Sequence, residues 1–292
     1  MSNEWLRVSA KNTCPICGKP DWCGFSRDEK TGEMSAAVCM RIDSDHATAN
    51  GGRLHRLKET PRDPRRFIPL PKMDESPKID AAEIMRGYRA ATSLEKISAY
   101  AADLGVAASP LEWMDVNWAA EHSAWAWPMR NGDGDIIGIR LRNSIAEKWA
   151  VRGSKQGLFY PSDPKDNFDR IAYVCEGPTD TAAALTLGLW AVGRAACRGQ
   201  SEMLTTFFGY FGIRKVVVIA DNDVAKDGPK GPWYPGVEGA EALVKEIGLP
   251  WKILIPPEKD LRRWLQRGCT REAIAALESH HVWKEGRKCQ QE

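Results

Sequence analysis

The second half of the chain alternates short apolar strands with helices, and this pattern restricts its fold more than any other feature. Strands are expected at 171–175 (IAYVC), 215–220 (KVVVIA) and 251–255. Helices are expected over 179–187, 201–210, 237–247, 261–266 and 271–278. Strands that are apolar along their whole length are covered on both faces. The pattern therefore predicts an α/β fold with a mostly parallel sheet flanked by helices.

The first 58 residues differ in character, because they hold four of the eight cysteines of this 292-residue chain: Cys14, Cys17, Cys23 and Cys39. A segment this short buries too little apolar surface to fold stably without a disulfide or a bound metal ion. The N-terminus has no apolar stretch typical of export, so crowded cysteines indicate metal ligands rather than disulfides. Four thiolates predict a small zinc ribbon. Alternatively, one of the four is a buried free thiol and His46 or His55 is the fourth ligand, or no metal binds. The irregular cysteine spacing makes Cys23 the weakest candidate ligand of the four.

Composition suggests five segments. Residues 1–58 form the cysteine-rich domain, and residues 59–80 form a linker with five prolines. A mixed α+β subdomain follows at 81–167, the α/β domain at 168–283 and a polar tail at 284–292. In the mixed subdomain we expect a helix over 94–104 that ends at Gly105, and a second helix capped by Ser109 in a capping box with Glu112. A hairpin should join 125–129 to 136–142.

Acidic residues follow two of the expected parallel strands. Glu176 comes directly after the first strand, and Asp221 and Asp223 come directly after KVVVIA. The carboxyl ends of parallel strands line one edge of a sheet, so these side chains should converge there. Carboxylate oxygens gathered in this way suit Mg²⁺, or the similar Mn²⁺. The alternative is structural, because acids also end strands and cap helices.

The chain has 41 Lys and Arg and 39 Asp and Glu, so its net charge is small and any basic surface must be local. Arg140 and Arg142 alternate with apolar residues in one strand, and we expect both to face outward. The run 53–72 holds seven basic residues and is either a solvated linker or a tether for single-stranded DNA. Trp22 could stack on a base or pack. The expected core or interface tryptophans are Trp113, Trp118, Trp125, Trp127 and Trp149.

At this point the chain resembles a known family. Glu176-Gly177-x-x-Asp180 and Asp221-Asn222-Asp223, each after a strand, resemble the signature motifs of the Toprim domain. Lys259-Asp260 with Trp264-Leu265 resembles its third element. The upstream segments 128–130, 134–142, 148–149 and 157–159 resemble the region that precedes Toprim in phage- or plasmid-type DNA primases. No G-x4-G-K-[ST] phosphate loop occurs, so the resemblance is to forms without a fused helicase.

The resemblance implies template-directed synthesis of short RNA primers on single-stranded DNA from nucleoside triphosphates. Glu176, Asp221 and Asp223 would hold one or two Mg²⁺ or Mn²⁺ ions, with Glu176 either a ligand or a general base. Arg140, Arg142 and Lys148 would form a basic ridge that faces them, and Asp180, Lys259 and Asp260 would support the metal or nucleotide site. Trp22 would belong to the DNA-contacting ribbon. A separate replicative helicase and a cytoplasmic location in a bacterial host are also implied.

Three other functions are alternatives. A Toprim nuclease would use the same acids, but the ribbon and the basic subdomain argue against it. A non-catalytic DNA-binding accessory protein is disfavoured by the intact acidic motifs. A topoisomerase would need gate domains for which 292 residues leave no room. No apolar run approaches the roughly 20 residues of a membrane helix, so no membrane partner is expected.

Overall fold

Contacts along the chain divide it into an N-terminal unit, Met1–Asp74, and a C-terminal unit, Glu75–Glu292. The computed structural model describes residues 5–28, 31–48, 51–57, 79–164, 169–196, 199–227 and 232–286. Nearly all of the expected linker, the basic run beyond residue 57 and most of the expected tail lie outside these ranges. Within them, no helix combines the length and the apolar character that crossing a membrane requires.

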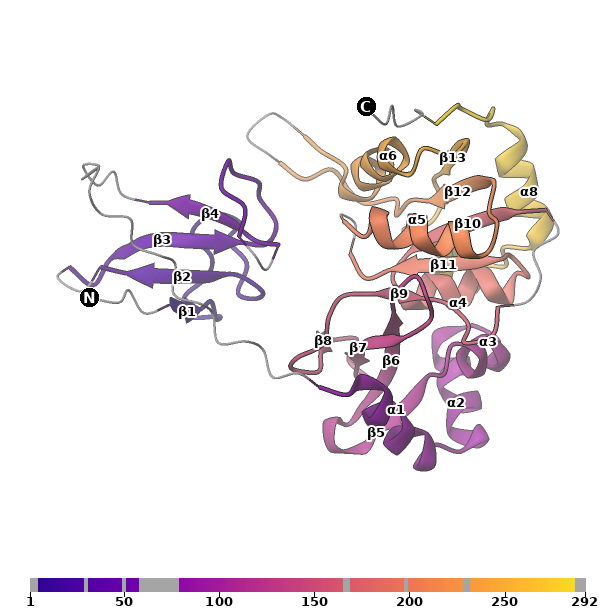
Figure 1. Ribbon diagram of the computed structural model, residues 1–292, viewed down its shortest axis with the longest axis horizontal. Coiled ribbons are helices and arrows are strands. Elements are labelled where there is room, and N and C mark those ends of the chain that lie inside the picture. Colours follow the sequence, from indigo (N-terminus) through magenta and orange to yellow (C-terminus); the bar gives the residue numbers. More distant parts are fainter. Residues whose placement is uncertain are drawn as a thin grey trace. The chain divides into compact units, whose positions relative to one another are not determined.

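An antiparallel sheet of four described strands forms the N-terminal unit (Figure 1). Its strands lie in chain order: β1 (Trp5–Arg7), β2 (Gly24–Arg27), β3 (Met34–Cys39) and β4 (Arg53–Arg56). Among the described residues of this unit, the buried core cluster holds three apolar side chains, Val8, Phe25 and Ala37, together with three of the cysteines. So small a core contributes little hydrophobic stabilisation. This agrees with the expectation that the unit needs a cross-link, such as a bound metal ion, to fold stably.

A single sheet with nine described strands runs through the C-terminal unit, in the order β13-β12-β10-β11-β9-β6-β7-β8, with β5 paired to β6. The bounds are β5 (Asn117–Ala119), β6 (Ala124–Arg130), β7 (Ile136–Arg142), β8 (Lys148–Ala150), β9 (Leu158–Phe159), β10 (Ile171–Glu176), β11 (Ala191–Arg194), β12 (Lys215–Ile219) and β13 (Trp251–Leu254). Strands β13, β12, β10 and β11 are parallel, and the others pair antiparallel. The predicted α/β class is confirmed, and its sheet extends into the segment before residue 168.

Helices cover both faces of this sheet (Figure 1). They are α1 (Ala81–Ala90), α2 (Leu94–Leu104), α3 (Ala108–Trp113), α4 (Pro178–Thr186), α5 (Ser201–Tyr210), α6 (Pro235–Ile247), α7 (Leu261–Gln266) and α8 (Arg271–Ser279), with a 3-10 turn at Ala120–His122. Val217 and Ile219 pack in the core cluster of α4, α7 and α8, whereas Val216 and Val218 pack in that of α5 and α6. This two-sided burial explains why the parallel strands are apolar throughout.

Most predicted elements are confirmed, but the capping box at Ser109 is wrong. Helix α3 begins at Ala108, and its N-cap, Ala107, makes no side-chain cap hydrogen bond. Ser109 and Pro110 therefore lie inside the first turn, where proline is tolerated because its missing N–H would have no helical partner. Helix α2 does end as predicted, at Gly105 in the left-handed conformation.

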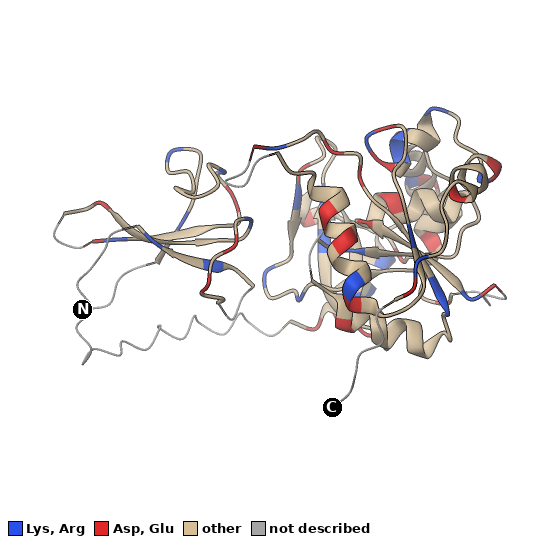
Figure 2. Cartoon of the chain, turned by 90° about the horizontal axis from the view of Figure 1, so that it is seen from above, with Lys and Arg blue, Asp and Glu red and all other residues tan. Residues whose placement is uncertain are grey.

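The predicted core tryptophans follow the expectation with one exception. Trp127 is fully buried, and the ring of Trp125 stacks on that of Tyr100 with centroids 4.3 Å apart. Trp118 packs edge-on against Trp125, and Trp149 packs against the cluster around α1. Trp113, however, is 39% exposed at the end of α3. Lysine, arginine, aspartate and glutamate are interspersed over the chain, as the small net charge suggests (Figure 2).

Candidate active site and candidate metal centre

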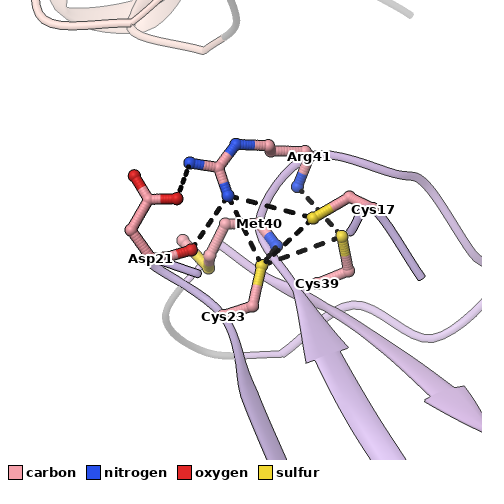
Figure 3. Close-up of polar contacts among 6 residues, drawn as sticks. All are labelled: Cys17, Asp21, Cys23, Cys39, Met40 and Arg41. Atoms are coloured by element: carbon pink, nitrogen blue, oxygen red, sulfur yellow. Dashed lines mark hydrogen bonds and ion pairs between the residues drawn. The ribbon is translucent and has the colours of Figure 1, made fainter. Parts of the chain in front are cut away.

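The four clustered cysteines of the N-terminal unit meet at one point. Their sulfur atoms all lie within 4.8 Å of one another, and none of the four is in a disulfide. Gly24 pairs with Val38 in the β2–β3 hairpin, which places Cys23 opposite Cys39. The Sγ atoms of this pair are 3.9 Å apart, and Cys17 Sγ lies 3.7 Å from Cys23 Sγ (Figure 3). The hairpin therefore explains the irregular cysteine spacing.

Neither histidine that could have replaced Cys23 joins this group. His55 Nε2 lies 3.1 Å from the carbonyl oxygen of Ile42, and His46 is not among the clustered ligands. Cys23, which the sequence marks as the weakest ligand, is 1% exposed and central to the cluster. Four sulfur donors in a closed group are the ligand set of a structural zinc site.

Hydrogen-bond donors surround these sulfurs (Figure 3). The backbone N–H of Met40 donates to Cys23 Sγ at 3.4 Å, and those of Arg41 and Ile42 donate to Cys39 Sγ at 3.4 and 3.3 Å. The Arg41 guanidinium lies 3.7 Å from Cys23 Sγ and is paired with Asp21 at 2.8 Å. Burial raises the pKa of Cys23 and of Cys39, which disfavours their thiolates unless a cation binds. The donors and the cationic Arg41 stabilise thiolates, so the site fits Zn²⁺.

The predicted acids lie at the carboxyl edge of the parallel strands. Strands β10 and β12 are neighbours with Val174 opposite Val218, so Glu176 and Asp221 end adjacent strands. After Ala220 the chain leaves the sheet, because the N–H of Asn222 donates to the Lys259 carbonyl oxygen at 2.8 Å and its Nδ2 to that of Pro256 at 3.1 Å. The loops after β12 and β13 are thus held together at Asn222.

Five carboxylates interact there, and we call them the acidic cluster: Glu176, Asp180, Asp221, Asp223 and Asp260. Burial, together with the charges of the other four members, raises the pKa of Asp221 to about 9. Burial also raises the pKa of Asp180 to about 6 and that of Glu176 above its usual range. Burial is the largest cause of each shift, and the neighbouring carboxylates add to it at Asp180 and Asp221, so the ionised forms of these acids are disfavoured without a bound cation.

The carboxylates do not form a closed ligand set in the way that the sulfurs do. Among the described residues, the four cysteines are the only group of three or more potential ligands placed closely enough to hold a metal ion. Like charges without a cation repel, and Mg²⁺ commonly takes only one or two carboxylates and keeps several waters. An open group of hard oxygen donors that destabilise one another is therefore compatible with Mg²⁺ or Mn²⁺.

Asp180 and Asp260 also have structural roles. The buried Asp180 lies in the first turn of α4, but its Oδ1 accepts a hydrogen bond from the Arg262 N–H of α7 at 2.9 Å. Asp260 is the N-cap of α7 and accepts from the N–H of Arg263 at 2.6 Å. The Lys259 carbonyl oxygen accepts the hydrogen bond from the Asn222 N–H, and the Lys259 side chain is exposed. These residues hold the loop after β13 against the acidic cluster.

The prediction that both arginines of β7 face solvent is wrong for Arg140. This residue is 8% exposed, and its Nη2 donates to the carbonyl oxygen of Ala195 at 3.2 Å. Alternation along β7 does put Ile139 and Leu141 in the core cluster around α1 and the arginines on the opposite face. The chain after β11 contacts that second face, which is why Arg140 is covered.

Arg142 and Lys148 do approach the acidic cluster. Burial lowers the pKa of Arg142, while the charges of Asp180 and Asp260 oppose this effect. Desolvation lowers the pKa of Lys148, and the charges of Asp180 and Asp221 oppose it, although Lys148 still reaches solvent. Basic side chains from β7 and β8 thus interact with acids from α4 and from the loops after β12 and β13.

Two further cations of the site were missed by the sequence analysis. Arg194 ends β11 opposite Glu176, is 3% exposed, and exerts the largest charge effect that lowers the pKa of Glu176. Lys226, in the segment after Asp223, lowers the pKa of Glu176 as well. A strand after the helix at 179–187 could have been predicted, because a helix that follows a parallel strand is normally followed by another strand. Arg194 lies at the end of that strand.

Two predicted DNA contacts lie in the N-terminal unit. Trp22 is 41% exposed, directly before Cys23, with a positive φ of 68°. Its ring is thus accessible beside the cysteine cluster. Of the basic run, Arg53 pairs with Asp43 at 2.6 Å and Arg56 is exposed.

Close packing of α6 against the turn after β12 requires a glycine. A Cβ added to Gly236 would lie 2.4 Å from the Asp221 carbonyl oxygen, so we expect Gly236→Ala to lower the melting temperature measured by circular dichroism. Gly87→Ala is the matched control, because Gly87 lies in α1 with no atom within 4 Å of an added Cβ. It should stabilise by about 0.5–1 kcal/mol through helix propensity. A neutral Gly236→Ala would show that the turn is not packed this tightly.

No protein-family model and no curated protein matches this chain. Solved structures do match. The DnaG primase catalytic domain bound to ssDNA aligns with a TM-score of 0.52 and 13% identity over 70% of this chain and 79% of that one. The Aquifex aeolicus primase (zinc-binding and RNA polymerase domains) gives 0.55 and 14% over 74% and 64%, and the E. coli primase catalytic core gives 0.53 and 11% over 70% and 79%. At these identities the likeness is one of fold.

Proposed function

We propose that this chain is a DNA primase that synthesises short RNA primers on a single-stranded DNA template. One observation carries the proposal: Arg142 and Lys148 approach the acidic cluster at the carboxyl edge of a primase-like sheet. A polymerase needs this combination, because template and triphosphate are polyanions while the reacting phosphate needs a cation. The four-cysteine group in the N-terminal unit, which would be a zinc ribbon, adds a second element found beside the polymerase domain in the Aquifex aeolicus structure.

In this proposal Glu176, Asp221 and Asp223 hold one or two Mg²⁺ or Mn²⁺ ions. The metal supplies charge that stabilises the departing pyrophosphate and activates the primer 3′-hydroxyl. Asp221 gives up a proton when the cation binds, because burial raises its pKa to about 9 beforehand. Alternatively, Glu176 is not a ligand and accepts the hydroxyl proton, a role that its burial-raised pKa suits.

The basic residues bind and orient in this scheme. Arg142 and Lys148 contact phosphates of the template or the nucleotide. Arg262 is a further candidate, because its Nε is buried and has no hydrogen-bond partner in the described part of the chain. Arg140, held by the Ala195 carbonyl, positions the strand that carries Arg142. Asp180 and Asp260 fix the α7 N-terminus beside them.

The finer features of the resemblance complete the proposal. The chain would be of the phage or plasmid type without a fused helicase and would act with a separate replicative helicase. Residues 1–58 would contact single-stranded DNA through the ribbon and Trp22. Residues 59–80 would link them to the basic subdomain, 81–167, and the Toprim domain, 168–283. A Toprim nuclease would use the same acids but has no evident use for a basic ridge and a ribbon.

The experiment that tests the proposal separates these two activities. The full chain is incubated with Mg²⁺, labelled ribonucleotides and single-stranded DNA, and a parallel reaction contains labelled DNA without nucleotides. A primase yields short labelled products only when template is present. Degraded DNA without new product would support the nuclease, and DNA binding with neither product would support the accessory protein.

A further inference from the structure

The segment between Asp223 and α6 folds back on itself as a hairpin. The N–H of Lys226 donates to the carbonyl oxygen of Trp233 at 2.9 Å, and the N–H of Trp233 donates to that of Lys226 at 2.9 Å. Lys226 Nζ lies 5.8 Å from the centroid of the Trp233 ring. In Figure 1 the two sides of this segment extend away from the sheet beside α6. We refer to its described residues, 224–227 and 232–234, as the 224–234 hairpin.

The 224–234 hairpin keeps large side chains at the surface. Val224 is 85% exposed and Tyr234 is 50% exposed, Lys226 is exposed, and Trp233 is half-buried. None of these residues belongs to the core clusters of the C-terminal unit. Exposed aromatic and apolar groups on a projecting element contribute little to folding, and such groups commonly mark interaction sites.

The position of the hairpin connects it with the acidic cluster. It starts directly after Asp223 and ends at Tyr234, the N-cap of α6. The second residue of this helix, Gly236, packs against the Asp221 carbonyl. The two backbone hydrogen bonds and the ring hold the Lys226 ammonium on this element. A cation and two aromatic rings are thus presented beside the candidate catalytic acids.

We propose that the 224–234 hairpin binds the single-stranded nucleic acid that approaches the acidic cluster, with Lys226 at a phosphate and a base stacked on Trp233 or Tyr234. Cation plus aromatic ring is the combination that recognises single strands without sequence preference, because every base has a stacking face and every nucleotide a phosphate. The inference rests on the proposed function, which makes a single strand the polymer at this edge. Template DNA and primer RNA share this chemistry, and the test separates them.

The test compares hairpin variants with a control of the same local structure. Lys284 also pairs by two backbone hydrogen bonds with a tryptophan, Trp251, and its Nζ lies 4.8 Å above that ring. Trp251 begins β13, so Lys284 lies at the amino end of the parallel strands, away from the acidic edge. Lys226→Ala, Trp233→Ala, Trp233→Phe, the Lys226→Ala/Trp233→Ala double variant and Lys284→Ala are made in the full chain. Fluorescence anisotropy then gives affinity for a labelled oligodeoxynucleotide and an oligoribonucleotide over a salt series.

We expect the double variant to bind about tenfold more weakly, since one base loses its stacking partner and one phosphate loses its cation. Lys226→Ala should reduce the slope of log affinity against log salt by about 0.7, the value for one phosphate contact on a single strand. Trp233→Phe should bind nearly as the wild type does, and so should Lys284→Ala. The oligonucleotide that loses more affinity identifies the strand as template or primer.

Wild-type affinity and salt slope in Lys226→Ala and in the double variant would overturn the inference, and so would a wild-type chain that binds neither oligonucleotide. Lys226→Ala leaves the backbone pairing intact, so it remains informative if Trp233→Ala unfolds. Primer synthesis by the wild type decides the proposed function separately. Weakened binding by the variants without any primer synthesis by the wild type would support the hairpin site and contradict the primase function. Unchanged binding with normal synthesis would support the primase function and contradict the hairpin site.

Discussion

Asp221→Asn should raise the melting temperature of the metal-free protein by several degrees, where about 1 kcal/mol corresponds to about 2–4 °C for a domain of this size. The folded-state pKa of Asp221, about 9, lies far above the ordinary value of 3.8. Between these values the folded state holds a proton that the unfolded state releases, so stability falls as the pH rises. Asparagine removes this penalty. The gain over wild type should therefore grow from about pH 5 to pH 9, as thermal melts in chelator will measure.

Added Mg²⁺ should reverse the difference in stability between the wild type and Asp221→Asn. The wild type should be stabilised by added Mg²⁺, increasingly at high pH, because the cation binds the ionised carboxylate of the folded state. Asp221→Asn should lose most of this stabilisation, whereas Asp133→Asn, at an exposed position of the β6–β7 hairpin, should behave as the wild type. If Asp221→Asn unfolds in chelator, the acidic cluster is a structural network and not a metal site.

Cys23→Ser should remove zinc and unfold the N-terminal unit. Structural zinc contributes roughly 10–16 kcal/mol in small metal-stapled domains, far more than the few apolar side chains of this unit can supply. Metal analysis should find about one zinc per wild-type chain and none in the variant. Amide dispersion in NMR spectra of the two proteins will report the fold of residues 5–57.

A buried thiol elsewhere provides the control. Cys269 is 6% exposed in the C-terminal unit, outside the cysteine cluster, so Cys269→Ser should keep its zinc. Full zinc retention in both Cys14→Ser and Cys39→Ser would contradict the assignment of all four cysteines as ligands. Retention in Cys23→Ser alone would instead restore the alternative in which a histidine completes the site.

How far the sequence predicts this molecule depends on the range of the interactions. The strands β10 and β12 are predictable because both faces of each are buried, which leaves an apolar run in the sequence. The acids that follow them are then placed by the geometry of parallel strands alone. Strand β11 has only four residues, AVGR, and no such run, so Arg194 was missed with it.

Contacts between distant segments account for the other errors. Alternation along β7 shows which residues share a face, but it does not show that the chain after β11 contacts the face of Arg140. The spacing of Cys23 looked irregular because the β2–β3 hairpin, and not sequence proximity, brings it to Cys39. Ser109 had the residues of a capping box, yet α3 begins one residue earlier, at Ala108. Local patterns thus gave the faces and strand ends, and tertiary contacts determined burial.

The most direct test of the central claim is template-dependent nucleotide incorporation by the wild type, Asp221→Asn and Glu176→Gln, assayed side by side with Mg²⁺. Loss of a residue that only orients a metal ligand costs about 10–100-fold, so loss of a ligand should reduce synthesis by more than about a hundredfold. The account predicts short products from the wild type that require template, and their absence in both variants although circular dichroism shows them folded. Template-dependent products from either folded variant at the wild-type rate, or none from the wild type, would contradict it.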